Sequence, residues 1–105
     1  MDVSQRIKET VDSNRVMLFM KGNRDFPQCG FSGRAIQILQ ALGAEFETAD
    51  VLMDDEIRQG IKEFSNWPTV PQLYINGEFV GGSDIMMEMY ENGELKKALS
   101  QTPAG

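Results

Sequence analysis

The sequence predicts an α/β domain in which helices flank a four-stranded mixed β-sheet. Segments whose apolar residues recur at helical spacing alternate along the chain with short apolar runs typical of buried strands. The last two predicted strands are joined by Asn76-Gly77, a pair that favours a hairpin turn. The 105 residues, of which 41% are hydrophobic and 25% charged, suit a single domain spanning residues 1–105 with one core.

The first half of the chain predicts a helix followed by a parallel β-α-β unit. Val3, Ile7 and Val11 recur at helical spacing, and "RVMLFMK" follows as an apolar run bounded by charge, as in a buried strand. After the loop "GNRDFPQ", a second helix ends at Gly43. The predicted apolar face of this helix consists of Phe31, Ala35, Ile38, Leu39 and Leu42. The segment "AEFETADV" then predicts the second strand.

A third helix and a hairpin come next. Asp54 or Asp55 can cap a helix whose inner face carries Ile57, Ile61 and Phe64. Gly60 lies within this helix, where it costs about 1 kcal/mol relative to alanine. The segment "NWPTVP" ends the helix, and "QLYI-NG-EFV" predicts an antiparallel hairpin with a type I′ turn.

The last predicted element is a helical region from Ile85 to about Leu99, interrupted near Asn92-Gly93. The turn "GGSD" precedes it, with Ser83 or Asp84 as the N-cap. The tail from Gln101 is expected to be loose. The order is then α-β-α-β-α-β-β-α on a four-stranded mixed sheet, which is the thioredoxin-like arrangement.

Composition excludes several classes of function. No apolar run, the longest being "VMLFM", approaches the roughly 20 residues that a membrane span needs. A net charge of −6 without a basic cluster disfavours nucleic-acid binding. A single cysteine excludes an intramolecular disulfide, and no apolar signal region follows Met1. We therefore expect a cytoplasmic protein, or one of an organellar stroma or matrix if a targeting peptide has been removed.

The single cysteine, Cys29, lies between a proline turn and the start of the second predicted helix. Its sulfur is expected near unpaired backbone N–H groups and the positive end of the helix dipole, and both favour thiolate. Lys21, at the end of the first strand, can approach the same opening. A lone cysteine is more often a small buried hydrophobe. Here the flanking Pro27, Gly30 and Ser32 indicate a turn, which favours a reactive thiol with a lowered pKa.

Separated motifs resemble one known family over nearly the whole chain. "KG" ahead of "DFPQCGFS", followed by "NWPTVPQLYINGEFVGGSDI", is similar to the monothiol glutaredoxins of the CGFS type. The sequence departs from the family at "NR" (23–24), in a variable part of the loop, and at Ser83, where family members often have cysteine. The second departure removes a candidate resolving thiol.

The resemblance gives Ser32 a meaning, because a dithiol oxidoreductase has its second cysteine at that position. Without it, Cys29 can attack a glutathione mixed disulfide, but a second glutathione must then release the adduct. The resemblance implies that such activity is weak. Serine is also common at the start of a helix. This structural interpretation of Ser32 and the functional one can both be true.

The resemblance also implies a groove for glutathione. Pro71 matches a cis proline that faces the active cysteine, and the backbone of Val70 would pair with the cysteinyl part of glutathione. An ordinary trans proline is the alternative. Asp84, with the amides after Gly81-Gly82, suits the γ-glutamyl end, although Asp84 is also a plausible plain N-cap.

The glycyl carboxylate of glutathione would meet a basic edge of the third helix. Arg58 and Lys62 lie four residues apart, away from the apolar stripe, and Arg58 matches the family's glutathione-binding arginine. A solvated surface pair is the alternative. The residues predicted to bind glutathione are Lys21, Arg58, Lys62, Trp67, Thr69, Val70, Pro71, Gly82, Ser83 and Asp84.

Two main hypotheses of different class remain for the function, a cluster carrier and an oxidoreductase. A 2Fe-2S cluster needs four ligands, commonly thiolates, whereas the chain has one Cys and no His. The resemblance implies that Cys29 of two subunits and two glutathiones share a labile cluster in a homodimer, with a monomeric apo form. This carrier would pass clusters to acceptor proteins. The sequence leaves open whether a BolA-like protein, which pairs with members of this family, replaces one subunit. The alternative is a glutathione-dependent oxidoreductase with Cys29 as nucleophile; a plain thioredoxin-fold interaction module is a third, weaker hypothesis.

Overall fold

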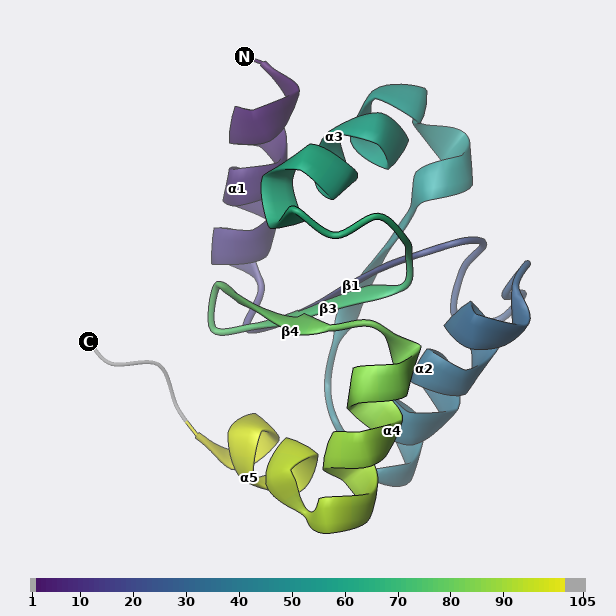
Figure 1. Cartoon of the computed structure of the whole chain (residues 1–105), viewed down its shortest axis with the longest axis vertical. Coiled ribbons are helices and arrows are strands. Elements are labelled where there is room, and N and C mark those ends of the chain that lie inside the picture. Colours follow the sequence, from purple (N-terminus) through teal and green to yellow (C-terminus); the bar gives the residue numbers. More distant parts are fainter. Residues whose placement is uncertain (1, 102–105) are drawn as a thin grey trace.

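The computed structural model of the chain describes residues 2–101 (Figure 1). The tail predicted to be loose lies, after Gln101, outside the described residues. The elements are α1 (Val3–Ser13), β1 (Val16–Met20), α2 (Gly30–Ala41), β2 (Glu47–Asp50), the 3-10 helix η1 (Val51–Met53), α3 (Asp55–Ser65), β3 (Gln72–Ile75), β4 (Glu78–Gly81), α4 (Ser83–Asn92) and α5 (Glu94–Ser100). This order confirms the predicted one, with the last helical region divided in two at Gly93.

The strands form one four-stranded sheet in the order β2-β1-β3-β4. β1 pairs in parallel with β2, whereas β3 is antiparallel to both of its neighbours, so the predicted mixed sheet is confirmed. Asn76 and Gly77 adopt φ angles of 53° and 83°, as the predicted type I′ hairpin requires.

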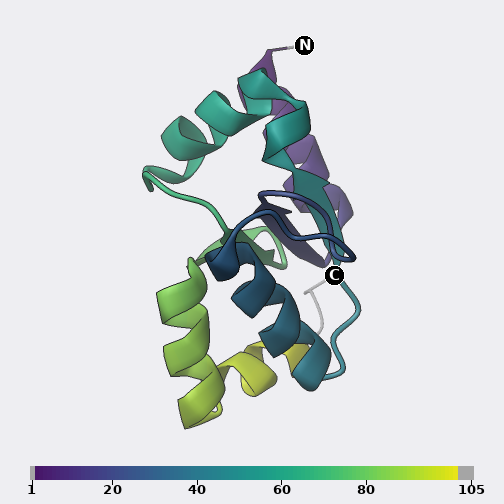
Figure 2. The same ribbon diagram turned by 90° about the vertical axis from the view of Figure 1, so that its right-hand side faces the viewer.

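Helices cover both faces of the sheet, because successive side chains of a strand point to opposite faces. Val16, Leu18 and Met20 of β1 pack on one side with α2, α4 and α5. Met17 and Phe19 pack on the other side with α1 and α3. Figures 1 and 2 show the two layers of helices with the sheet between them. Each fully buried aliphatic or aromatic side chain stabilises the fold by about 1.5–3 kcal/mol relative to exposure.

Gly60 allows α3 to lie close against α1. A Cβ atom at this position would lie 3.0 Å from the side chain of Val3 and 3.2 Å from that of Ile7. The close approach of the two helices therefore explains a glycine that is unfavourable for the helix alone.

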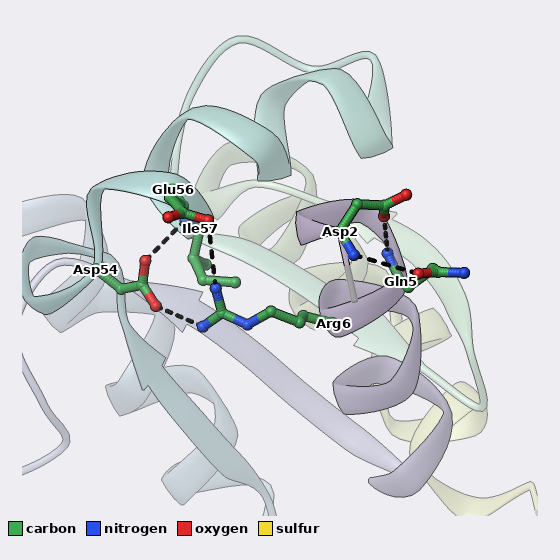
Figure 3. A network of polar contacts seen from close by, with 6 residues as sticks. All are labelled: Asp2, Gln5, Arg6, Asp54, Glu56 and Ile57. Carbon is green, nitrogen blue, oxygen red and sulfur yellow. Dashed lines mark hydrogen bonds and ion pairs between the residues drawn. The ribbon is translucent and has the colours of Figure 1, made fainter.

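A polar network fixes the start of α3 on α1 (Figure 3). Asp54 is the N-cap of α3 and accepts a hydrogen bond from the backbone N–H of Ile57 at 3.1 Å. Its other oxygen pairs with the guanidinium of Arg6 at 2.7 Å, and this contact lowers the pKa of the Asp54 carboxyl. The Asp2–Gln5 capping box begins α1 in the same region. The network orients the helix that carries Arg58 and Lys62.

One residue of the predicted apolar face of α2 is wrongly assigned. Phe31 is 56% exposed, whereas Ile36, which the prediction omitted, is buried. The reason is that the first turn of α2 borders an open cavity, so the buried face begins only further along the helix.

The predicted N-cap of α4 is also wrong. Gly82 is the N-cap, and its carbonyl accepts a hydrogen bond from the N–H of Met86 at 2.9 Å. Ser83 and Asp84 belong to the first turn, and neither side chain caps the helix. Their side chains are thus free for another role.

No helix within residues 2–101 combines the length and the apolar character needed to cross a bilayer.

Candidate functional site

A cavity of about 560 Å³ lies where β1 ends and β3 begins, and its volume is within the roughly 300–1,000 Å³ typical of small-molecule sites. Its walls come from the end of β1, the start of α2, α3, the segment before β3 and the start of α4. The lining residues are Lys21, Cys29, Phe31, Arg58, Lys62, Trp67, Pro68, Thr69, Val70, Pro71, Gly82, Ser83, Asp84 and Ile85.

The structure brings Cys29 and every residue predicted to bind glutathione to this one cavity. Sequence reasoning missed Phe31, Pro68 and Ile85. Phe31 was assigned to the core because helical spacing shows which side chains share a face but not where along the helix the core ends. The position of Pro68 within "NWPTVP" was a usable signal, since its neighbours were already predicted to line the groove.

A closed loop places Cys29 beside the end of β1. The backbone N–H of Gln28 donates to the carbonyl of Lys21 at 2.9 Å, and Gly22 forms an isolated bridge with Pro27. The carboxylate of Asp50 accepts from the N–H of Gly22 at 2.9 Å. The loop between β1 and α2 therefore closes on itself, and α2 begins close to Lys21, the residue that follows β1.

The two loop residues that depart from the family pattern stabilise this loop. The side-chain oxygen of Asn23 accepts from the N–H groups of Asp25 and Phe26 at 3.0 and 2.9 Å. Arg24 lies over the ring of Phe46, 4.3 Å from its centroid, and donates to the carbonyl of the same residue. The loop is thus tied to the segment that precedes β2.

Gly22→Ala is expected to destabilise the protein by roughly 3 kcal/mol. Gly22 has a φ of +87°, and a Cβ atom there would lie 2.5 Å from the carbonyl oxygen of Phe26 and 2.6 Å from the nitrogen of Gln28. Gly43→Ala is the matched control, because Gly43 has a φ of +68° but no atom within 4 Å of the added Cβ. Its expected loss is about 1 kcal/mol. Equal losses in urea denaturation would contradict the backbone collision at Gly22.

Cys29 is the N-cap of α2 and is half-buried. The pKa of its thiol is lowered, first by the backbone N–H of Ser32 and less strongly by that of Phe31 and by the charge of Lys21; burial opposes them. The sulfur makes no capping hydrogen bond of ordinary geometry, so the helix start remains open. This environment favours a thiolate that can act as a nucleophile or as a metal ligand.

Ser32 is completely buried, and its hydroxyl accepts a hydrogen bond from the backbone N–H of Lys21 at 3.1 Å. The bond joins the first turn of α2 to the end of β1. The position where a dithiol protein has a second cysteine is thus occupied by a hydroxyl with a structural bond.

The segment before β3 lines the cavity from Trp67 to Pro71. The Val70–Pro71 peptide bond is cis, as predicted. Among residues 2–101, no hydrogen bond uses the N–H or the C=O of Val70. Val70 lines the cavity, and two backbone groups without a partner are what pairing with an extended ligand would use.

The two ends of the cavity differ in charge. Arg58 and Lys62 come from α3, and within the described part of the chain neither forms an ion pair, nor does Lys21. Asp84 and the open N-terminus of α4 come from the opposite face of the sheet. The cavity therefore offers cations at one end, and backbone N–H groups with a carboxylate at the other.

Cys29 lines two hollows. A second, shallower hollow adjoins it on the outer face of α2 and is lined by Pro27, Gln28, Cys29, Gly30, Gly33, Arg34 and Gln37. Residues 2–101 contain no group of three or more His, Cys, Asp or Glu side chains that would hold a metal ion. Cys29 is the only cysteine of the chain, so one chain offers a single thiolate at this half-buried position.

Comparison with known proteins gives consistent matches. The family model described as Glutaredoxin matches residues 16–80. The chain is 63% identical over 98 residues to an uncharacterised monothiol glutaredoxin of Synechocystis, covering 93% of this chain and 92% of that protein. It is 55% identical over 95 residues to the chloroplastic monothiol glutaredoxin-S7 of rice, covering 90% of this chain but 56% of that protein.

A solved structure of a glutaredoxin–glutathione complex from buckwheat has the same fold, with a TM-score of 0.84 and 28% identity. The similarity covers 93% of this chain and 87% of that one.

Proposed function

Since the chain belongs to the glutaredoxin family and is 63% and 55% identical to two of its monothiol members, we propose that it binds glutathione and carries a labile 2Fe-2S cluster to acceptor proteins. One observation supports this proposal above all others: a lone, thiolate-favouring Cys29 at the edge of a peptide-sized cavity. The cluster is cargo, and the chain supplies one of its ligands.

Each part of glutathione has a matching group in the cavity. The glycyl carboxylate would meet the unpaired cations of Arg58 and Lys62, and the cysteinyl backbone would pair with the unused N–H and C=O of Val70. The γ-glutamyl carboxylate suits the N–H groups at the start of α4, and its ammonium suits Asp84. The thiol of the bound glutathione would then lie near Cys29.

One chain cannot hold the cluster alone, and a second chain with two glutathiones would complete the ligands. A 2Fe-2S cluster needs four ligands, and Cys29 is the only cysteine in a chain without histidine. Two copies of Cys29 and two glutathione thiols complete the set in a homodimer. Glutathione is bound noncovalently, so the cluster is labile, which favours transfer over storage. A BolA-like protein is a candidate to replace one subunit.

The lowered pKa of Cys29 favours a second candidate, a glutathione-dependent oxidoreductase. The Cys29 thiolate would attack the glutathione sulfur of a mixed disulfide, forming a Cys29–glutathione disulfide and releasing the other thiolate. A second glutathione thiolate would then attack that glutathione sulfur, so that oxidised glutathione leaves and the Cys29 thiolate is restored. Ser32 has no thiol to replace the second glutathione, which is consistent with weak activity.

The visible spectrum of protein purified without oxygen separates the two candidates. A cluster carrier is coloured, with the absorbance of a 2Fe-2S centre that disappears on chelation of iron. Colourless protein that cannot be reconstituted, yet reduces a glutathione mixed disulfide, would favour the oxidoreductase.

Arg58→Glu is expected to raise the Kd for glutathione at least about tenfold, because it reverses the charge opposite the glycyl carboxylate. Arg34→Glu is the matched control: it makes the same change of charge, but Arg34 lines the shallower hollow instead of the cavity. Isothermal titration calorimetry measures both. An unchanged affinity of Arg58→Glu, or an equal loss in Arg34→Glu, would remove Arg58 from the site.

We place this function in the cytoplasm or, since the similar rice protein is named as chloroplastic, in an organellar stroma.

A further inference from the structure

Gln72 is a completely buried amide in an otherwise apolar central strand. β3 has the sequence Gln-Leu-Tyr-Ile, and all its residues are buried because helices cover both faces of the sheet. Burying an amide without hydrogen-bond partners destabilises the folded state. The position therefore needs specific partners for both ends of the amide.

Both ends of the amide have such partners. Nε2 of Gln72 donates to the carbonyls of Trp67 and Thr69 at 3.3 and 3.1 Å. Oε1 accepts from the hydroxyl of Tyr74 at 3.2 Å. Carbonyl oxygens only accept hydrogen bonds, so the NH2 group must face the two carbonyls and the amide oxygen must face the hydroxyl. The reversed amide would place its oxygen against two other acceptors.

The two carbonyls belong to the irregular segment 66–71, which forms one wall of the cavity. Trp67 is tied to the end of α3 through its N–H, which donates to the carbonyl of Lys62 at 3.1 Å and to Ser65 Oγ at 3.1 Å. Among residues 2–101, Gln72 supplies the only side-chain hydrogen bonds that tie this segment to the sheet. Gln72 itself does not line the cavity.

Tyr74, which donates to Gln72, lies in an aromatic cluster. Its ring packs against Phe19, Phe64 and Phe79, with centroid separations of 5.7, 6.1 and 5.4 Å. A continuous path thus leads from the aromatic core, through one hydroxyl and one amide, to the carbonyls on either side of Pro68.

We propose that Gln72 is a positioning residue, which fixes the backbone of segment 66–71 so that Val70 and Trp67 are preorganised for glutathione. This inference rests on the proposed glutathione site. Holding the segment in its binding conformation before glutathione arrives strengthens binding. If only a fraction of the molecules has that conformation, the observed Kd is the intrinsic Kd divided by this fraction.

Gln72→Met tests the proposal, since methionine has a similar length but no N–H donor. If the segment keeps its binding form about a tenth of the time, the Kd for glutathione rises about tenfold. Trp67 is the only tryptophan, so its fluorescence reports on this segment alone. We expect acrylamide to quench Trp67 more strongly in free Gln72→Met than in the free wild-type protein. Added glutathione should reduce this difference.

Leu95→Ala is the control for a general loss of stability. Leu95 is completely buried on α5, in the core on the other face of the sheet from Tyr74. Its truncation should lower the unfolding temperature while leaving both the Kd and the quenching of Trp67 unchanged. An affinity of Gln72→Met within twofold of wild type, or an equal loss of affinity in Leu95→Ala, would overturn the positioning role.

Tyr74→Phe covers the case in which Gln72→Met fails to fold. It removes the donor to Oε1 and leaves the Nε2 bonds, so we expect a smaller rise in quenching and in Kd, about twofold to threefold. No rise in either would overturn the proposed path. If wild-type protein does not bind glutathione, the proposed function fails, whereas the quenching of Trp67 still decides whether Gln72 holds the segment.

Discussion

Replacing Cys29 with serine is expected to abolish both cluster binding and the release of glutathione from mixed disulfides. The chain has no other cysteine, so each copy loses the only thiolate that it can offer to iron. A serine hydroxyl stays protonated near neutral pH, and the groups that lower the pKa of the Cys29 thiol cannot make it a comparable nucleophile. Absorbance of the reconstituted protein and a mixed-disulfide assay measure the two losses.

The fold of Cys29→Ser provides the control. Cys29 occupies the N-cap of α2 without making a capping hydrogen bond, whereas serine is among the best N-cap residues. We expect the unfolding free energy to stay the same or rise by about 0.5–1 kcal/mol. Loss of cluster in a variant of undiminished stability assigns the effect to the sulfur; retained cluster absorbance in the variant would sink that assignment.

Local chemistry allowed most of the fold to be predicted. The short apolar run of β1, bounded by charged residues, and the Asn76-Gly77 turn are short-range signals that need no knowledge of distant residues. Both errors occur at the first turn of a helix. There, the burial of a side chain and the identity of the N-cap depend on which other elements lie beside that turn. Phe31 faces the cavity instead of the core, and Gly82 caps α4 in place of Ser83 or Asp84.

The candidate site was predictable for a different reason. The character of Cys29 was argued from its neighbours in the sequence, and the direction of its pKa, lowered first by the backbone N–H of Ser32, agrees with that argument. The convergence of Arg58, Pro71 and Asp84 on one cavity does not follow from spacing, because they lie on separate elements; it came from the resemblance to a family. Gln72 was missed altogether, since its hydrogen bonds exist only after the segment before β3 has folded back over the sheet.

The second large effect concerns assembly: a coloured dimer is expected to form only when glutathione is present. Two chains supply two thiolates, which is half of what a 2Fe-2S cluster needs. Without the cluster, each copy has a net charge of −6, and the surface around the site is small and partly polar. Like charges oppose association, so most of the stability of the dimer must come from the shared cluster.

Reconstitution with iron and sulfide tests this expectation when mass and visible absorbance are recorded together by size-exclusion chromatography with light scattering. Three samples are compared, with glutathione included, omitted, or replaced by an analogue that lacks the thiol. The analogue is the sharpest control, because it can fill the same cavity and offer the same charges to Arg58 and Asp84 but cannot bind iron through sulfur. Only the sample with glutathione should contain a coloured dimer, and chelation of its iron should return the monomer. A coloured dimer that forms equally well with the analogue, or with no small thiol at all, would show that other ligands complete the cluster, and the glutathione-bridged arrangement would then be wrong.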